Sequence, residues 1–225
     1  MCYNVESSLK TSLLSLFAIL YLLSSNDPHY KWIALTLVGW CLMQFAEMLL
    51  WLTEPKNSCT DMNKIITMTL IPTILILQPL GALLGSLFVI PWSKSTDIRK
   101  NFLILYPALI IALVSVKHFY KPEKVCTTVT PNGHLFWSTG HNENSPLDMV
   151  QYVIWSTLIM LPLLIFWDKS FIIIALLILL PTFGFYYGFL NSDSRGSIWC
   201  YYTSYTSVIA TTALLLEQTG VYRII

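Results

Sequence analysis

The stretch that most constrains this chain is an apolar run of twenty residues, Trp32 to Trp51, which contains a single charged side chain, Glu47. As a helix the run would be about 30 Å long, which matches the hydrocarbon thickness of a bilayer. Gln44 lies one turn before Glu47 on the same helical face, and Trp40 and Trp51 extend that face at helical spacing. A carboxylate is costly to place in lipid, so this face is expected to turn toward protein or a water-filled cavity, with the other helices gathered around it.

Composition supports a membrane environment. Hydrophobic residues make up 55% of the 225 residues, charged residues 11%, and the mean hydropathy is +0.63, whereas soluble domains have about 25% charged residues. The formal charge of +1 argues against a nucleic-acid partner, which usually requires a basic face. The lipid bilayer is therefore the expected partner, and no nucleic acid is expected.

The apolar runs predict an all-α, polytopic bundle of seven transmembrane helices in one domain covering 1–225. A cleaved signal peptide is the alternative for the first run, but Glu6 cancels Lys10, and Ser24-Ser25-Asn26 is a poor cleavage site. An odd number of spans places the two termini on opposite faces. The predicted spans are residues 8–24, 30–52, 64–90, 102–118, 148–167, 170–190 and 197–218.

Lysine and arginine do not orient the bundle, because the two sides carry six and seven of them. The cysteines are more informative, because Cys2, Cys59, Cys126 and Cys200 all fall on one face and only Cys41 lies within a span. An even number of cysteines on one side suggests disulfides and an extracytoplasmic face. Four cysteines allow three pairings, of which we favour Cys59–Cys126 with Cys2–Cys200; the alternative is reduced thiols on a cytosolic face.

Several short motifs resemble a poorly characterised family of multi-span membrane proteins, a domain of unknown function, whose members begin Met-Cys-Trp-Ser. The segments that carry the resemblance are the opening Met-Cys-Tyr, Met43-Gln44-Phe45-Ala46-Glu47, Cys59 followed by Asn63, Gln78-Pro79, Cys126 with Gly133-His134-Leu135-Phe136-Trp137, and Gly196-Ser197-Ile198-Trp199-Cys200. The chain departs from that pattern in two ways. The acid and amide of the second span are exchanged, and Leu75 or Ile76 replaces a histidine before Gln-Pro. The resemblance implies a multi-span fold and carries no established activity.

Three kinds of chemistry are disfavoured by the sequence. Zinc needs three or four converging ligands, and none of the four histidines lies deep in a span, so no metal site is predicted. The last span contains no lysine for a retinal Schiff base, and no other cofactor is predicted. A nucleophilic Cys2 would need an electropositive setting that the sequence does not show.

The remaining candidate is a polar seam of Trp40, Gln44, Glu47 and Trp51 in the second span and Gln78 in the third, with Glu217 and Gln218 as further members. As a functional site it would bind or conduct a small molecule, lipid or ion in a pocket that opens toward the cysteine-bearing face. The alternatives are an enzyme acting on lipids, with Glu47 as acid/base and Cys2 or His134 contributing, and a structural protein in which these residues hold helices together. The sequence leans toward the non-enzymatic reading.

Overall fold

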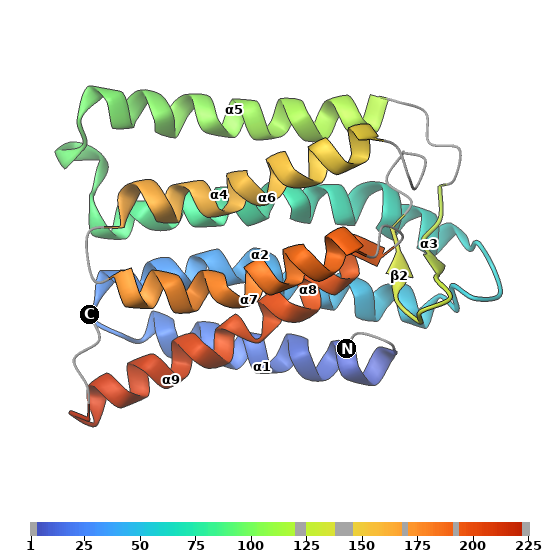
Figure 1. The fold of residues 1–225 in the computed structure, drawn as a ribbon, viewed down its shortest axis with the longest axis horizontal. Coiled ribbons are helices and arrows are strands. Elements are labelled where there is room, and N and C mark those ends of the chain that lie inside the picture. Colours follow the sequence, from blue (N-terminus) through green and yellow to red (C-terminus); the bar gives the residue numbers. More distant parts are fainter. Residues whose placement is uncertain (1–3, 120–124, 138–145, 168–170, 191–193, 222–225) are drawn as a thin grey trace.

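The computed structural model describes residues 4–119, 125–137, 146–167, 171–190 and 194–221, and within these ranges the chain is almost entirely helical. The helices run side by side in alternating directions (Figure 1). The elements are α1 Val5–Leu23, α2 Pro28–Leu52, α3 Asp61–Ile65, the π-helical turn η1 Ile66–Leu70, α4 Ile71–Val89, the 3-10 turn η2 Trp92–Lys94, α5 Asp97–Phe119, β1 Thr128–Val129, β2 Leu135–Phe136, α6 Pro146–Phe166, α7 Phe171–Leu190, α8 Arg195–Ser204 and α9 Thr206–Gln218.

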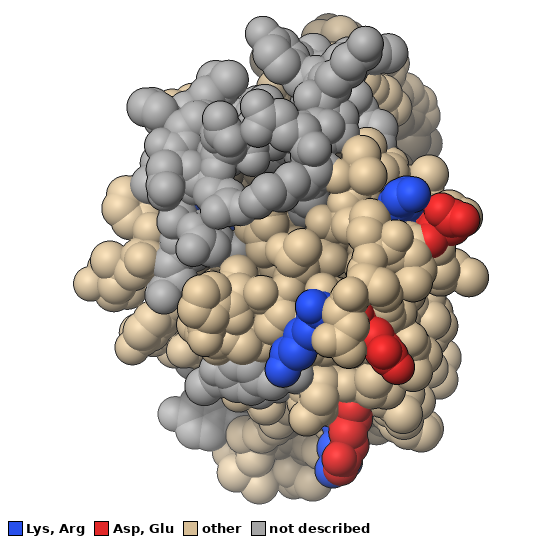
Figure 2. Space-filling view, turned by 90° about the vertical axis from the view of Figure 1, so that its right-hand side faces the viewer, with Lys and Arg blue, Asp and Glu red and all other residues tan. Residues whose placement is uncertain are grey.

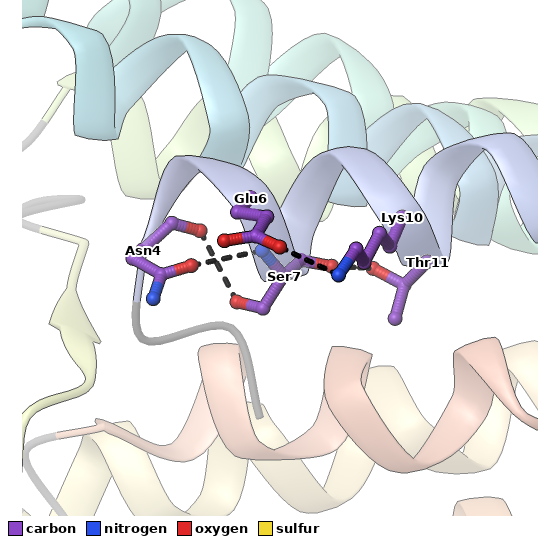
Figure 3. Close-up of polar contacts among 5 residues, drawn as sticks. All are labelled: Asn4, Glu6, Ser7, Lys10 and Thr11. Carbon is purple, nitrogen blue, oxygen red and sulfur yellow. Dashed lines mark hydrogen bonds and ion pairs between the residues drawn. The ribbon is translucent and has the colours of Figure 1, made fainter.

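Local polar signals set where the first helix begins. Asn4 is the N-cap of α1: its Oδ1 accepts a hydrogen bond from the Ser7 backbone N–H at 2.8 Å, and Ser7 Oγ donates to the Asn4 carbonyl at 3.1 Å (Figure 3). Such a bond satisfies one of the orphan donors of a helix N-terminus. Glu6 and Lys10 pair on the next turn at 2.5 Å. The helix therefore begins at Val5, three residues before the predicted start of the first span.

Helix α1 is built the opposite way from a helix of a soluble protein. Its inward face carries small polar side chains, and its outward face carries large apolar ones. The buried residues include Ser8, Thr11, Ser12 and Ser15, and the exposed ones include Leu13, Leu16, Phe17 and Leu20. Small polar residues between helices with apolar side chains facing outward are typical of helix packing in lipid.

Helix α2 is the central element of the bundle, since α1, α4, α8 and α9 all pack against it. Glycines allow α4 to approach it closely. A Cβ on Gly81 would lie 2.6 Å from the Leu35 carbonyl oxygen, and a Cβ on Gly39 would lie 2.8 Å from the Gln78 Cα. Gly85 likewise lies against Trp32. Gly81 and Gly85, four residues apart, thus form a small-residue pair that packs α4 against α2.

Proline interrupts several of these helices, and neighbouring aromatic side chains compensate. Pro79 has no N–H to donate to the Leu75 carbonyl, and Trp155 of α6 donates its indole N–H to that oxygen at 3.4 Å. Pro162 similarly frees the Leu158 carbonyl, which accepts from the Tyr106 hydroxyl of α5. Carbonyls freed by proline inside a membrane must find such partners.

Four helical stretches are long and apolar enough to cross a membrane, judged by length and composition over the described residues: Val5–Leu23, Pro28–Leu52, Asp61–Val89 and Asp97–Ser115. The described apolar parts of α6 and α7, Tyr152–Phe166 and Ile178–Leu190, are shorter. The last predicted span is not one continuous helix, because α8 ends at Ser204 and α9 begins at Thr206. These helices are compatible with an integral membrane protein.

A short antiparallel hairpin, not anticipated from the sequence, lies in the polar segment between α5 and α6. Thr128 pairs with Phe136 and Val129 with Leu135, and Gly133 takes the left-handed conformation, φ 83°, in the turn. We call the end of the bundle that carries this hairpin the cap end. Figure 2 faces it, and the charged side chains it shows are in a few small groups, with no broad patch of one sign.

Candidate functional site

The predicted polar face of α2 points into the bundle. Gln44 and Glu47 are 0% exposed and Trp40 is 3% exposed, so the expectation that these three side chains face the interior is confirmed. Trp51 is half-buried and packs against the main core cluster. The Trp40 ring meets the Trp199 ring of α8 edge to face, with centroids 5.6 Å apart.

Gln78 is also fully buried, but on a different side of α2. Its Nε2 donates to the Gly39 carbonyl at 3.4 Å, and Gly39 lies about 100° around the helix from Trp40. Gln78 therefore belongs to the α2–α4 contact. A role for it in ligand binding stays a prediction.

Glu217 and Gln218 do not join the polar face of α2, contrary to the expectation. Tyr30 donates its hydroxyl to Glu217 Oε2 at 2.8 Å, and Tyr21 donates to Gln218 Oε1 at 2.5 Å. Tyr30 precedes Glu47 by seventeen residues of α2, a rise of about 25 Å. These two residues thus stabilise the opposite end of the bundle.

The contact between α1 and α2 sets a register that extends to Glu47. Thr11 donates its hydroxyl to Gln44 Oε1 at 3.2 Å, and Cys41 Sγ donates to the Ser12 carbonyl at 3.3 Å. The helices α1 and α2 are antiparallel (Figure 1). The residue three before Thr11 and the residue three after Gln44 therefore lie at the same level along the bundle. This register places Ser8 opposite Glu47, one turn closer to the cap end.

The contact of α1 with α8 and α9 gives a second register. Ser15 donates to the Ser204 carbonyl at 3.4 Å, and its hydroxyl also lies 3.4 Å from Ser207 Oγ. The helices α1 and α8 run in the same direction (Figure 1), and Ser8 and Ser197 each precede their partners in this contact, Ser15 and Ser204, by seven residues, or two turns. Along the bundle axis, Ser197 therefore lies two turns nearer the cap end than Ser204, as Ser8 does relative to Ser15.

We call Ser8, Glu47 and Ser197 the Glu47 layer, and Ser15, Ser204 and Ser207 the Ser15 layer. All three members of the Glu47 layer are 0% exposed. The hydroxyls of Ser8 and Ser197 have no hydrogen-bond partner within the described residues, and the same holds for the indole N–H of Trp40. Buried polar atoms are nearly always satisfied by protein, water or ligand, so the lack of a bond at these atoms within the described residues distinguishes this region from the rest of the interface.

The cap end is held over this region by covalent and polar links. Cys59 and Cys126 form a disulfide with their Cα atoms 5.7 Å apart, which confirms the favoured first pairing. Beside it, Asn63 Nδ2 donates to the Thr127 carbonyl at 3.0 Å and the Thr127 N–H donates to Asn63 Oδ1 at 2.8 Å. The Thr67 hydroxyl lies 2.8 Å from Thr127 Oγ1. The hairpin is therefore fixed to the first turns of the third span.

The hairpin also reaches the start of α8 and the bundle core. Asn132 Nδ2 donates to Ser194 Oγ at 3.0 Å, Leu135 joins the main core cluster, and the Trp137 ring lies against Gly196. His134 is 6% exposed, and burial lowers the pKa of its imidazole to about 4. His134 is therefore neutral at physiological pH.

The described residues bear on two further sequence predictions, the second disulfide pairing and metal binding. Cys2 lies outside the described residues, and Cys200 is buried in α8, so the second pairing, Cys2–Cys200, stays a prediction. Within the ranges that the structure describes, no group of three or more His, Cys, Asp or Glu side chains could hold a metal ion.

Sequence reasoning missed Ser8 and Ser197, and the signal for them was weak. On α1 the inward residues Ser8, Thr11, Ser12 and Ser15 follow helical spacing, which small polar residues between lipid-embedded helices often do. Nothing in that pattern separates a bonded serine from an unbonded one. The difference comes from which helices lie opposite, and the sequence does not show this.

Comparison with known proteins gives no relative from which a role could be transferred: no protein-family model, curated protein or solved structure matches the chain.

Proposed function

We propose that this chain is a seven-span integral membrane protein with a polar intramembrane site around Glu47, and that it binds or conducts a small polar molecule, lipid or ion there. The seven spans would be α1, α2, the continuous α3-η1-α4 rod, α5, α6, α7 and the broken α8–α9 rod. Their alternating directions (Figure 1) and the outward apolar side chains of α1 support this arrangement. Membership of the Met-Cys-Trp-Ser family is part of the same proposal.

The cysteine-bearing cap end and the N-terminus are proposed to lie outside the cytoplasm. The Cys59–Cys126 disulfide supports this orientation, since disulfides persist in oxidising compartments. Labelling of single introduced cysteines from each side of the membrane tests it. Opposite accessibility of positions in the loop 53–60 and in the hairpin would contradict the seven-span order.

One observation carries the proposed site. Glu47 carries a fully buried carboxyl, and the helix registers place it near the level of Ser8 and Ser197, whose fully buried hydroxyls have no hydrogen-bond partner within the described residues. Ionisable residues inside membrane helices usually mark a substrate or ion pathway. Helix packing alone would favour hydroxyls that bond across the interface, as the Ser15 hydroxyl does to the Ser204 carbonyl.

The test compares what the protein retains through purification. Wild type and Glu47→Gln are purified from the same membranes in the same detergent, and bound small molecules and lipids are extracted and identified by mass spectrometry. We expect a near-stoichiometric species in the wild type that falls about tenfold in Glu47→Gln, a loss of about 1.4 kcal/mol of binding free energy. Glu217→Gln, at the far end of the bundle, serves as the matched control and should retain it. Equal retention in all three proteins would leave Glu47 with a packing role only.

A further inference from the structure

The first turn of α8 lies where α6, α7 and the hairpin segment meet. A Cβ on Gly188 of α7 would lie 2.6 Å from the hydroxyl oxygen of Tyr152 in α6 and 3.1 Å from the carbonyl oxygen of Arg195 in α8. The Tyr152 hydroxyl and Arg195 therefore lie against the same glycine. In the same turn of α8, the Trp137 ring lies against Gly196. A glycine on each helix thus lets side chains from α6 and the hairpin segment approach the start of α8.

The Tyr152 ring is held by stacking, while its hydroxyl makes no bond. The ring stacks on Phe185 of α7, with centroids 5.1 Å apart and planes 5° apart, and on Trp155, with centroids 6.4 Å apart. The hydroxyl oxygen is buried and has no hydrogen-bond partner within the described residues. A buried tyrosine hydroxyl usually finds a partner, so this one is a donor fixed beside α8 and available to an acceptor.

Arg195 brings a positive charge to the same place. It is partly buried, and its charge is close enough to the Tyr152 hydroxyl to interact with it electrostatically. Its Nε atom is buried without a hydrogen-bond partner, and none of the ion pairs among the described residues involves it. A guanidinium stays charged at any physiological pH, and a charge is costly to bury unless an opposite charge lies near it. An anion bound here would therefore be stabilised.

The amino end of α8 adds further donors. Ser194 is the N-cap residue, but its side chain makes no capping hydrogen bond; its Oγ instead accepts from Asn132 Nδ2 at 3.0 Å. The first N–H groups of a helix have no partner within the helix, and the helix dipole favours an anion beside them. A guanidinium, a phenol hydroxyl and N–H groups are all donors, and together with the positive charge they suit an oxyanion.

We propose that Arg195, Tyr152 and the amino end of α8 form a binding site for a phosphate group, carried by a membrane lipid or free in solution. The guanidinium fork matches phosphate oxygens in a bidentate arrangement. The site lies at the cap end, because the hairpin that defines this end bonds to Ser194. None of its residues belongs to the polar face of α2, so this inference goes beyond the proposed function and does not rest on Glu47.

The experiment uses the full chain purified in dodecyl maltoside, an uncharged detergent, and follows thermal unfolding by tryptophan fluorescence. Dioctanoyl phosphatidate is titrated into the micelles and compared with dioctanoylglycerol, which has the same acyl chains and no phosphate. In parallel, sodium phosphate replaces sodium chloride at constant ionic strength. We expect a phosphate-bearing probe to raise the unfolding temperature saturably, since a ligand that binds the folded state stabilises it. A shift with phosphatidate alone identifies a lipid head group, and a shift with both probes identifies free phosphate as sufficient.

Variants locate the effect. Arg195→Gln removes the charge and should weaken the apparent affinity for the phosphate probe about tenfold or more, or about 1.4 kcal/mol. Tyr152→Phe removes only the hydroxyl, keeps the stacked ring and should weaken the affinity about fivefold. Arg195→Lys keeps the charge but loses the fork, and its affinity should lie between those of the wild type and Arg195→Gln. Lys10→Gln removes a positive charge from the same end of the bundle; it is the matched control and should keep the wild-type affinity.

Two results would overturn the phosphate site. In the first, neither phosphate probe shifts the unfolding temperature relative to its phosphate-free counterpart. In the second, the affinity stays at the wild-type value in both Arg195→Gln and Tyr152→Phe, or in Tyr152→Phe alone where Arg195→Gln does not fold. Glu47→Gln separates this site from the proposed function, because it should lose the small molecule retained through purification and keep the response to phosphate. Failure of either proposal therefore leaves the other standing.

Discussion

The two serine layers along α1 are similar in sequence and different in structure. In the Ser15 layer, the hydroxyls and a carbonyl of α1, α8 and α9 bond to each other. In the Glu47 layer, two turns nearer the cap end, serines at the same spacing are equally buried and the two hydroxyls make no bond within the described residues. Serines at the same spacing therefore bond across one interface and make no such bond, within the described residues, at the other.

The two ends of the bundle next to these layers are also closed in different ways. Beyond the Ser15 layer, the far end of the bundle is closed by Tyr30–Glu217 and Tyr21–Gln218 hydrogen bonds. Next to the Glu47 layer, the hairpin and its disulfide provide a cover that is a separate element, attached at defined points. A cover of this kind can be loosened without unfolding the helices.

The largest expected effect comes from the disulfide. Replacing Cys59 and Cys126 with serine removes a link between residues 67 positions apart, which should lower the free energy of unfolding by about 4 kcal/mol by the chain-entropy argument. Hydrogen exchange should accelerate most in the hairpin and least in α9. Free thiols at both positions in protein purified without reductant would show that the disulfide is absent and that the hairpin is not covalently attached to the loop before α3.

Acid should weaken the cap end next. Burial lowers the pKa of His134 to about 4, below the unfolded value of about 6.5, so the unfolded state takes up the proton first. Stability should be lost as the pH falls from about 6.5 toward 4, by up to about 3 kcal/mol. Denaturant titrations at several pH values measure the loss, and His134→Asn should flatten it. If the free energy of unfolding of His134→Asn depends on pH as steeply as that of the wild type, the pH dependence belongs to other groups.

Glu47 should tolerate an isostere better than an apolar residue. Glu47→Gln is expected to fold nearly normally, because shape and hydrogen bonding are kept. Glu47→Leu should cost about 1 to 3 kcal/mol, because neighbouring polar groups lose a partner. Unfolding in mixed micelles compares the two variants. Equal stability of both would mean that the carboxyl makes no structural contribution, which would sharpen the contrast with the bonded Ser15 layer.

The smallest effects should differ in sign between the two layers. Ser15→Ala removes a bonded hydroxyl and should destabilise the protein by about 1 kcal/mol. Ser197→Ala removes a hydroxyl with no described bond, and without a bound ligand it should be neutral or slightly stabilising, since an unsatisfied buried polar group carries a desolvation cost. Both are measured by denaturant unfolding in the same detergent and buffer. Equal destabilisation by both variants would indicate that the layers are alike.

Spacing rules predicted much of the site, because they report which face of one helix is polar. They correctly placed Trp40, Gln44 and Glu47 in the interior, and cysteine placement favoured Cys59–Cys126. They failed where the answer depends on the neighbouring helix. Gln78 lies on another side of α2, and Glu217 bonds to Tyr30 at the far end.

The hydrophobic pattern also did not predict the irregular local structure. The helix break at Tyr205 and the hairpin around Gly133 depend on short-range geometry within sequences that look uniformly apolar or polar. The π-helical turn Ile66–Leu70 lies just before Pro72, where the missing proline N–H disturbs the regular ladder. Each changes how elements meet while leaving the hydrophobic periodicity almost intact.

The most direct test of the central claim is an experimental density map of the protein in lipid at high resolution. The account predicts a density feature enclosed by Ser8, Glu47 and Ser197, at contact distance from all three, and no corresponding feature among Ser15, Ser204 and Ser207. A map in which the Ser8 and Ser197 hydroxyls bond directly to each other or to Glu47, with nothing between them, would contradict it.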